Sequence, residues 1–267
     1  MNIKLLVSDI DDTLIGDDLK LSQRTIDTIK KVQDKGVRVA IATGRTHDSA
    51  YPYVDQLNLH GPVLSFQGAV IVDTLTKETI RYCPLPYEQA KEVLAFAEEH
   101  ECYAQYYAMD KMFIEKHCAE SDGYISLTKV PAEEVGAPLK DKLDFDPIKV
   151  LLIADAEKIG RLYDIAKERF GDSMEIARSK QLYLEFTHPD ANKGEAVKIL
   201  AKRYNIPMEE VMTIGDGLND IPMIKAAGLG VAIGNAYEAT KAVADVIAEP
   251  QDEDGAAKAM EQYILNA

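Results

Sequence analysis

Both ends of the 267-residue chain alternate between short apolar runs and longer segments with helical periodicity. At the N-terminal end, the apolar run 5–8 precedes the segment 21–36, whose apolar residues recur at helical spacing. We expect this helix to take Ser22 as its N-cap and to stop at Gly36. The β-rich segment 37–44 follows, so the order strand, helix, strand predicts a parallel βαβ unit with a right-handed crossover.

The C-terminal end repeats this alternation. Helical patterns cover the segments 192–206, 219–228, 236–245 and 252–267, and apolar β-rich runs cover 211–217, 229–235 and 246–250. Strands that alternate with helices are typical of α/β proteins. We therefore predict that the two ends form one Rossmann-like, doubly wound parallel sheet.

The middle of the chain has a different pattern. Helical segments at 87–100 and 157–170 are mixed with β-rich segments at 102–116, 149–154, 174–179 and 182–187. We expect a catalytic core of residues 1–83 and 190–267, interrupted by an inserted α+β domain of residues 84–189. The hinges are expected near Leu85 and His188.

Composition narrows the class of protein. Apolar residues make up 46% of the chain and charged residues 28%, as in ordinary globular proteins. The net charge of −15 disfavours nucleic acid as a partner. Three cysteines without a CxxC pair favour neither disulfides nor a zinc site. No signal peptide and no apolar run of 18 residues is found, so we expect a cytoplasmic protein without membrane spans.

Candidate chemistry lies where the predicted parallel strands end, which is where such sheets bind ligands. Asp9, Asp11 and Asp12 follow the first run, Thr43 and Gly44 follow the second core strand, and Asp216, Asn219 and Asp220 follow residues 211–215. Lys193 opens a helix that could bring its ammonium to the same place. Clustered carboxylates raise one another's pKa, and a hard divalent cation such as Mg²⁺ would relieve that repulsion. Metal, ammonium and neutral donors around a carboxylate indicate phosphoryl transfer.

Four short motifs carry a resemblance to a known family. The sequences DIDDT, TGR, NKG and GDGLND resemble, in this order, the four motifs of the haloacid dehalogenase superfamily. The insert between the second and third motifs resembles the type IIB cap of Cof-type phosphatases. The resemblance covers the whole chain and implies a Mg²⁺-dependent phosphatase that acts on small phosphorylated metabolites, such as sugar phosphates, through an aspartyl-phosphate.

The resemblance also implies roles for individual residues. Asp9 would be the nucleophile and Asp11 the general acid and base. The metal would be held by Asp9, the Asp11 backbone carbonyl and Asp216, with Asp220 supporting it from the second shell. The donors to phosphate would be Thr43, the Gly44 backbone, Lys193, Asn219 and the Ile10 backbone N–H.

Two positions depart from the family pattern. Asp12 stands where the family commonly has glycine, and we expect its side chain to point away from the phosphorus. Gln67 stands where relatives often have asparagine. Two other functions remain open: a phosphomutase of the same superfamily, and a receiver-like signalling module with a phosphorylated aspartate.

Overall fold

The computed structural model describes residues 2–109 and 111–267, so Asp110 of the expected segment 102–116 lies outside the described residues. The chain divides into two compact units. The first runs up to Gly44 and continues with Ala50–Arg81 and Asn192–Ala267, and the second contains Arg45–Ser49 and Tyr82–Ala191. Each unit has a sheet and a hydrophobic core of its own.

The first unit is built on an eight-stranded sheet with the order β14-β13-β12-β1-β2-β3-β4-β5. Its strands are β1 (Leu5–Ser8), β2 (Arg38–Ala42), β3 (Pro62–Ser65), β4 (Val70–Asp73), β5 (Thr79–Tyr82), β12 (Val211–Gly215), β13 (Leu229–Ala232) and β14 (Val246–Ile247). From β14 to β3 the neighbouring strands are parallel, whereas β3 and β4 pair antiparallel. Because the chain runs outward from β1 in both directions, the predicted doubly wound α/β fold is confirmed, and β4 and β5 extend it at one edge.

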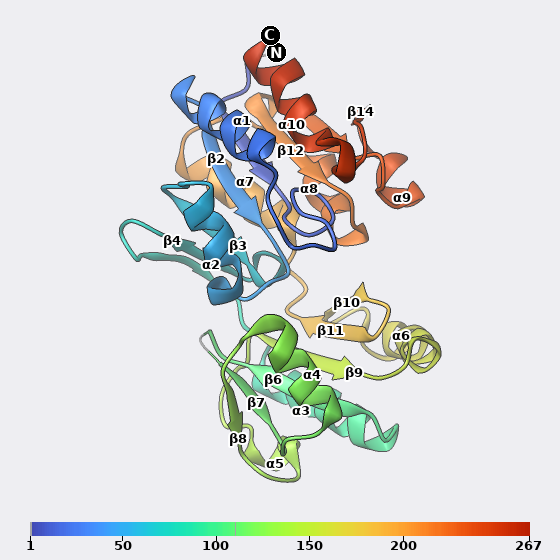
Figure 1. Ribbon diagram of the computed structural model, residues 1–267. Coiled ribbons are helices and arrows are strands. Elements are labelled where there is room, and N and C mark those ends of the chain that lie inside the picture. Colours follow the sequence, from blue (N-terminus) through green and yellow to red (C-terminus); the bar gives the residue numbers. More distant parts are fainter. Residues whose placement is uncertain (1, 110) are drawn as a thin grey trace. The chain divides into compact units, whose positions relative to one another are not determined.

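Helices cover both faces of this sheet (Figure 1). They are α1 (Gln23–Asp34), α2 (His47–Gln56), α7 (Lys193–Arg203), α8 (Ile221–Ala226), α9 (Glu238–Lys241) and α10 (Gly255–Met260). Leu6 of β1 packs in a cluster with α1, α2 and α10, while Leu5 and Val7 pack with α7 and α8. Side chains alternate along a strand, so a strand buried on both faces is mostly apolar, as Leu5, Leu6 and Val7 of β1 are.

Local capping explains where the first helix begins and ends. The Ser22 hydroxyl accepts a hydrogen bond from the Thr25 N–H, and Gly36 has a φ of 86°, a left-handed value that glycine tolerates. Both predictions for this helix are confirmed. The helix expected over 252–267 is less regular, because Asp254 is left-handed and separates a 3₁₀ turn at Gln251–Glu253 from α10. The expected helix 236–245 is reduced to α9.

The second unit is an α+β domain around a six-stranded sheet of order β10-β11-β9-β6-β7-β8. Its strands are β6 (Tyr103–Tyr107), β7 (Met112–Ile114), β8 (Ala132–Glu134), β9 (Lys149–Ile153), β10 (Glu175–Lys180) and β11 (Tyr183–Thr187). Its helices are α3 (Tyr87–Glu99), α4 (Ala119–Thr128), α5 (Leu139–Lys142) and α6 (Ala156–Phe170). All strand pairs are antiparallel except β7 with β8.

The two faces of the second sheet differ in chemistry. On one face, Tyr106 packs with α3 and α6 in an apolar core. On the other, the Lys149 ammonium and a Glu185 carboxylate oxygen form a buried ion pair at 2.9 Å. Helix α4 lies over this polar face, since the ring of Tyr124 contacts the ring of Tyr107 at a centroid distance of 6.3 Å. The second unit therefore has one sheet face with a conventional core and one with buried polar groups.

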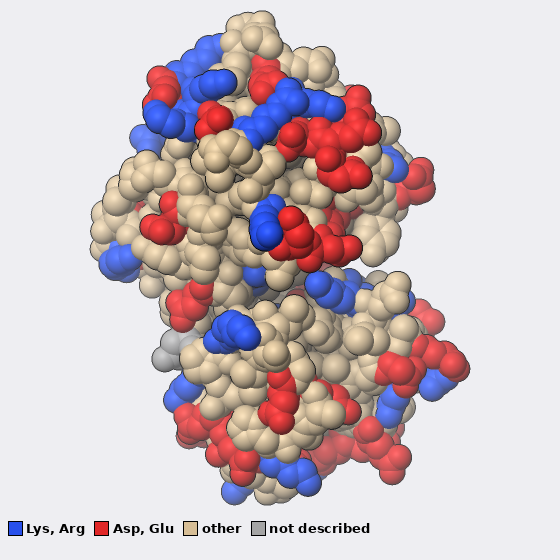
Figure 2. Space-filling model, viewed as in Figure 1, with Lys and Arg blue, Asp and Glu red and all other residues tan. Residues whose placement is uncertain are grey.

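The surface carries mixed charge. On the face shown in Figure 2, Lys and Arg side chains are interspersed with Asp and Glu over both units. Cys83, Cys102 and Cys118 are all free thiols. Over residues 2–109 and 111–267, no helix combines the length and the apolar character needed to cross a bilayer.

Candidate active site

Asp9 and Asp216 lie close together because two parallel strands end at the same edge of the sheet. Ser8, the last residue of β1, pairs in register with Ile214 of β12. Asp9 follows β1 directly and Asp216 follows β12 directly. The Asp9 N–H donates to the Ile214 carbonyl at 3.0 Å, which extends the ladder by one bond. Both aspartates are less than a tenth exposed, so their carboxylates are held away from bulk water.

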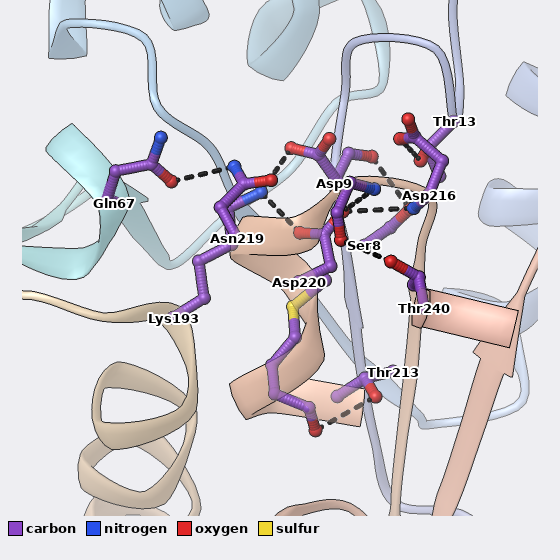
Figure 3. A network of polar contacts seen from close by, with 12 residues as sticks. Ser8, Asp9, Thr13, Gln67, Lys193, Thr213, Asp216, Asn219, Asp220 and Thr240 are labelled. Atoms are coloured by element: carbon purple, nitrogen blue, oxygen red, sulfur yellow. Dashed lines mark hydrogen bonds and ion pairs between the residues drawn. The ribbon is translucent and has the colours of Figure 1, made fainter. Parts of the chain in front are cut away.

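Lys193 brings a fully buried ammonium to these carboxylates. It is the first residue of α7, and the Asn192 side chain caps the helix by accepting from the Glu195 N–H at 2.9 Å. The Lys193 Nζ lies 2.7 Å from Asp9 Oδ1 and 2.6 Å from Asp220 Oδ1 (Figure 3). One cation thus joins two of the expected site residues across the sheet edge.

Asp220 and Thr13 fix the loop that carries Asp216. Asp220 ends the 3₁₀ turn Leu218–Asp220, and its Oδ2 accepts from the N–H groups of Asp216 at 3.0 Å and Gly217 at 2.8 Å. The Thr13 hydroxyl donates to Asp216 Oδ1 at 2.6 Å. Both oxygens of Asp220 are therefore engaged, one by Lys193 and one by backbone amides.

Burial and repulsion between carboxylates both disfavour ionisation of Asp9 and Asp216. Burial raises the pKa of Asp9 well above its usual value, repulsion by Asp220, Asp216 and Asp11 raises it further, and Lys193 opposes both. Burial and repulsion by Asp220 raise the pKa of Asp216 to about 7. Burial lowers the pKa of Lys193, but attraction to Asp220 and Asp9 outweighs that effect and raises it. The ammonium therefore stays charged, while the acids need more positive charge than it provides.

The acidic cluster fits a hard cation. One carboxylate oxygen from each of Asp9, Asp216 and Asp220 lies within 4.8 Å of the others. Lys193 neutralises one of the three charges, which leaves two uncompensated when all are ionised. Oxygen donors with this charge suit a divalent ion such as Mg²⁺. Among the described residues, this is the one group of three or more metal-ligating side chains at such distances.

The expected phosphate donors Thr43 and Asn219 are linked through Gln67. Thr43 follows β2, is fully buried, and donates its N–H to the Leu64 carbonyl at 2.8 Å. Its carbonyl accepts from the Gln67 N–H at 2.9 Å. The Asn219 Nδ2 donates to Gln67 Oε1 at 2.9 Å. Next to Thr43, a Cβ on Gly44 would lie 2.4 Å from the Gln67 Nε2, so a side chain at this position would displace the Gln67 amide.

The loop after β1 holds the remaining candidates. The Ile10 carbonyl accepts from the N–H groups of Leu14 at 2.8 Å and Ile15 at 3.0 Å, which makes the loop tight. Asp11 is half-buried, and in the described chain it is not part of the close carboxylate group. Asp12 is exposed and has a left-handed φ of 56°. A glycine-like conformation is thus retained at the position where the family commonly has glycine.

Sequence reasoning missed three polar contributors. Thr13 belongs to the DIDDT motif, but we gave it no role. Thr240 is fully buried, and its hydroxyl donates to the Gly217 carbonyl at 2.9 Å. Gln67 was noted only as a departure from the family pattern. A small polar residue inside a motif, as Thr13 is, was a usable signal, whereas nothing in the local sequence marks Thr240.

Comparison with known proteins identifies the family. A family model described as haloacid dehalogenase-like hydrolase matches residues 6–260. The chain belongs to the haloacid dehalogenase-like hydrolases. Enzymes of this family generally depend on a metal ion, and the cluster of Asp9, Asp216 and Asp220 is consistent with one.

Individual relatives support the same assignment. The 5-amino-6-(5-phospho-D-ribitylamino)uracil phosphatase YitU of Bacillus subtilis is 27% identical, over 97% of each chain. A haloacid dehalogenase-like hydrolase from Bacteroides thetaiotaomicron is 30% identical, with a TM-score of 0.86 over 97% of this chain and 99% of that one. The subclass IIB sugar phosphatase BT4131 is 25% identical, with a TM-score of 0.83 over 97% and 98%. The predicted resemblance is confirmed, and the chain is a haloacid dehalogenase-like enzyme of the phosphatase class.

Proposed function

We propose that this haloacid dehalogenase-like enzyme is a Mg²⁺-dependent phosphatase that hydrolyses small phosphorylated metabolites through an aspartyl-phosphate on Asp9. The observation that carries the proposal is the buried contact of the Lys193 ammonium with Asp9 and Asp220, beside Asp216. A carboxylate and a phosphate dianion repel each other, so attack requires positive charge at the point of contact. Lys193 provides part of that charge, and Mg²⁺ would provide the rest.

In the first step, an Asp9 carboxylate oxygen attacks phosphorus and the bond from phosphorus to the ester oxygen breaks. Asp11 gives its proton to the departing oxygen, which leaves as an alcohol. In the second step, Asp11 takes a proton from water, and the resulting hydroxide attacks phosphorus. The bond from phosphorus to Asp9 then breaks, which releases inorganic phosphate and restores the free carboxylate of Asp9.

The other residues hold the phosphoryl group and the metal. Asp9, the Asp11 carbonyl and Asp216 would bind Mg²⁺. Asp220 would support these ligands without contacting the ion itself. When bound, the ion would withdraw negative charge from the transferring group.

We expect the proposed phosphate donors to face the same phosphoryl group. They are the Thr43 hydroxyl, the Gly44 and Ile10 backbone, the Lys193 ammonium and the Asn219 amide. Preorganised donors of this kind stabilise charge that develops during transfer.

We propose sugar phosphates or related monoesters as substrates. The relatives named above include a sugar phosphatase and a phosphatase of a phosphoribityl compound. The inserted domain, residues 84–189, would contact the organic part of the substrate and exclude water. We also propose that the enzyme works in the cytoplasm. Its three cysteines are free thiols, and a reducing compartment keeps thiols in that state.

The decisive experiment replaces Asp9. We expect Asp9→Asn to abolish Mg²⁺-dependent release of phosphate from an aryl phosphate, because an amide cannot serve as the nucleophile. Asp12→Asn removes the same charge three residues away and should retain most activity. Near-normal turnover by Asp9→Asn would contradict the assignment. A panel of phosphorylated metabolites, assayed with the wild-type enzyme, would identify the substrate.

Two alternatives give different results in the same assays. A phosphomutase would need a bisphosphate activator and would transfer phosphate rather than release it. A receiver-like module would accumulate a stable aspartyl-phosphate without turnover. The large insert and an acid/base candidate, Asp11, two residues after Asp9 count against the receiver-like module. Release of inorganic phosphate without a bisphosphate activator would distinguish the phosphatase from the phosphomutase.

A further inference from the structure

The turn after β3 has an unusual backbone. Phe66, Gln67 and Gly68 follow one another with φ values of 50°, 58° and 89°. Left-handed conformations are uncommon for residues other than glycine, and two such non-glycine residues in succession require surroundings that fix them. Gln67 is nevertheless buried, with 5% of its surface exposed. The contacts of this turn therefore have to hold a strained backbone at a buried polar residue.

This turn contacts three segments that carry proposed phosphate donors. The Gln67 N–H donates to the Thr43 carbonyl at 2.9 Å. A Cβ on Gly68 would lie 2.8 Å from the carbonyl oxygen of Asn192, so the turn packs directly against the start of α7, where Lys193 begins. The Gln67 Oε1 accepts from the Asn219 Nδ2 at 2.9 Å (Figure 3). These segments are up to 152 residues from Gln67 along the chain.

The Asn219 amide is held in one of its two orientations. Its Oδ1 occupies space beside Gly217, where a Cβ would come within 2.2 Å, and its Nδ2 donates to Gln67. An amide nitrogen has two hydrogens, so the bond to Gln67 leaves one N–H for another acceptor. Without Gln67, the amide could rotate and turn its oxygen toward a phosphate, which would repel it.

We propose that Gln67 is a positioning residue that orients the Asn219 amide so that its second N–H donates to the phosphoryl group. This inference rests on the proposed function, because it assigns Asn219 to phosphate. Gln67 acts through Asn219 and through the backbone of Thr43, and it takes no part in bond making itself. The absence of a side chain at Gly44 leaves the room that the Gln67 amide needs.

A double-mutant cycle tests the coupling. Gln67→Met keeps the length of the side chain and removes its amide, and Asn219→Ala removes the oriented group. We expect each single variant to weaken binding of inorganic phosphate about tenfold in the presence of Mg²⁺, the effect of one hydrogen bond. The double variant should be no weaker than Asn219→Ala alone, within about twofold. Independent losses that multiply to about 100-fold would overturn the proposal, and so would a Gln67→Met variant that binds like wild type.

Two further variants separate positioning from general damage. Thr74→Val removes buried hydrogen bonds to Gly61 at the opposite end of the β3–β4 pair, so it should lower the unfolding temperature and leave phosphate binding unchanged. Gln67→Glu keeps an acceptor of the same reach. In that background Asn219→Ala should still weaken phosphate binding about tenfold, and a loss of this effect would count against the proposal. If Gln67→Met does not fold, Gln67→Ala replaces it with the same expectation.

The readouts also distinguish this inference from the proposed function. Phosphate binding is measured by calorimetry and does not depend on turnover. A wild-type enzyme that binds phosphate but hydrolyses no monoester would defeat the proposed function, and the cycle would still decide the role of Gln67. A wild-type enzyme that turns over while the cycle is additive would defeat the inference alone. A wild-type enzyme that neither binds phosphate nor turns over would defeat both.

Discussion

Asp12 shows how one residue can keep a conformation that favours another residue type. Its φ of 56° is left-handed, and its carbonyl accepts from the Asn235 Nδ2 at 2.8 Å, which helps to hold the loop. Aspartate tolerates this region better than most residues. The side chain is exposed, so the carboxylate keeps its hydration, in contrast to Asp9 three residues earlier.

Replacing Asp12 should therefore change stability slightly and activity little. Left-handed backbone costs about 1–2 kcal/mol for an L-residue, while glycine loses roughly 0.5–1 kcal/mol more entropy on folding. We expect Asp12→Gly to raise the free energy of unfolding in urea by about 0.5 kcal/mol and to keep kcat/KM within a few-fold of wild type. Asp12→Val, the control, should be less stable than wild type. A drop in kcat/KM of about 100-fold for Asp12→Gly would show that Asp12 takes part in the chemistry.

Single residues were predictable where a motif carried them. The position of Asp9 at the end of a buried strand follows from the apolar run before it. Lys193 is different, because a lysine followed by glycine says little, and its contact with Asp9 spans 184 residues of chain. Gln67 is less predictable still, since its role depends on a strained turn and on Asn219, which no local pattern connects.

At the level of whole elements, the polar face of the second sheet is the least expected feature. Lys149 of β9 and Glu185 of β11 are buried as an ion pair, and the Ser179 hydroxyl also donates to Glu185 Oε1 at 3.0 Å. Burial lowers the pKa of Lys149, but Glu185 outweighs that effect and raises it. Glu185 Oε2 is buried without a hydrogen-bond partner in the described structure. The Glu185 carboxylate therefore depends on Lys149 and Ser179 for its stabilisation.

Replacing one partner of this ion pair should destabilise the protein more than replacing both partners. Lys149→Met leaves an unpaired buried carboxylate, and we expect it to lower the free energy of unfolding by roughly 3–5 kcal/mol. The double variant Lys149→Met with Glu185→Leu should recover at least half of that loss, because no uncompensated charge remains. Urea unfolding of the two variants and of Glu185→Leu measures the coupling. Equal destabilisation by Lys149→Met and by the double variant would contradict this account.

In the second unit, the elements that the sequence patterns did not predict lack a clear apolar face. Helices α3 and α6 bury apolar side chains at helical spacing and were expected, as were strands β1, β2, β12, β13 and β14 of the first unit, whereas β3, β4 and β5 were not predicted. Helix α4 buries Ser121 and Tyr124 against tyrosines instead, so it shows no apolar stripe. Strand β8 has the sequence AEE, which offers no alternation of an apolar face.

For the molecule as a whole, the acidic cluster links stability to both pH and metal. In the metal-free fold the pKa of Asp216 is about 7, against an ordinary 3.8. A raised pKa means that the associated stability is present below pH ~4 and is lost as the pH rises through about 7. A bound cation favours the ionised form and so would oppose this loss.

Thermal unfolding at several pH values tests this linkage. In EDTA, we expect the midpoint to fall as the pH rises from 5.5 to 8.5, and saturating Mg²⁺ to reduce that fall. Groups remote from the site, such as His117, contribute equally with and without metal, so the difference isolates the cluster. Asp216→Asn should reduce the difference in pH dependence between the EDTA and Mg²⁺ measurements. Identical pH dependence in EDTA and in Mg²⁺ would show that the cluster does not bind the ion.

The place of β1 in the sheet has a consequence for synthesis of the chain. Leu5 pairs with Arg38 of β2 on one side and with Val211 of β12 on the other. While a ribosome makes the protein from its N-terminus, the first partner emerges early and the second only after more than two hundred residues. One edge of a buried, largely apolar strand thus stays open until β12 has been made, which is the kind of edge that pairs with other chains. The inserted unit, with its own core, can fold during that wait.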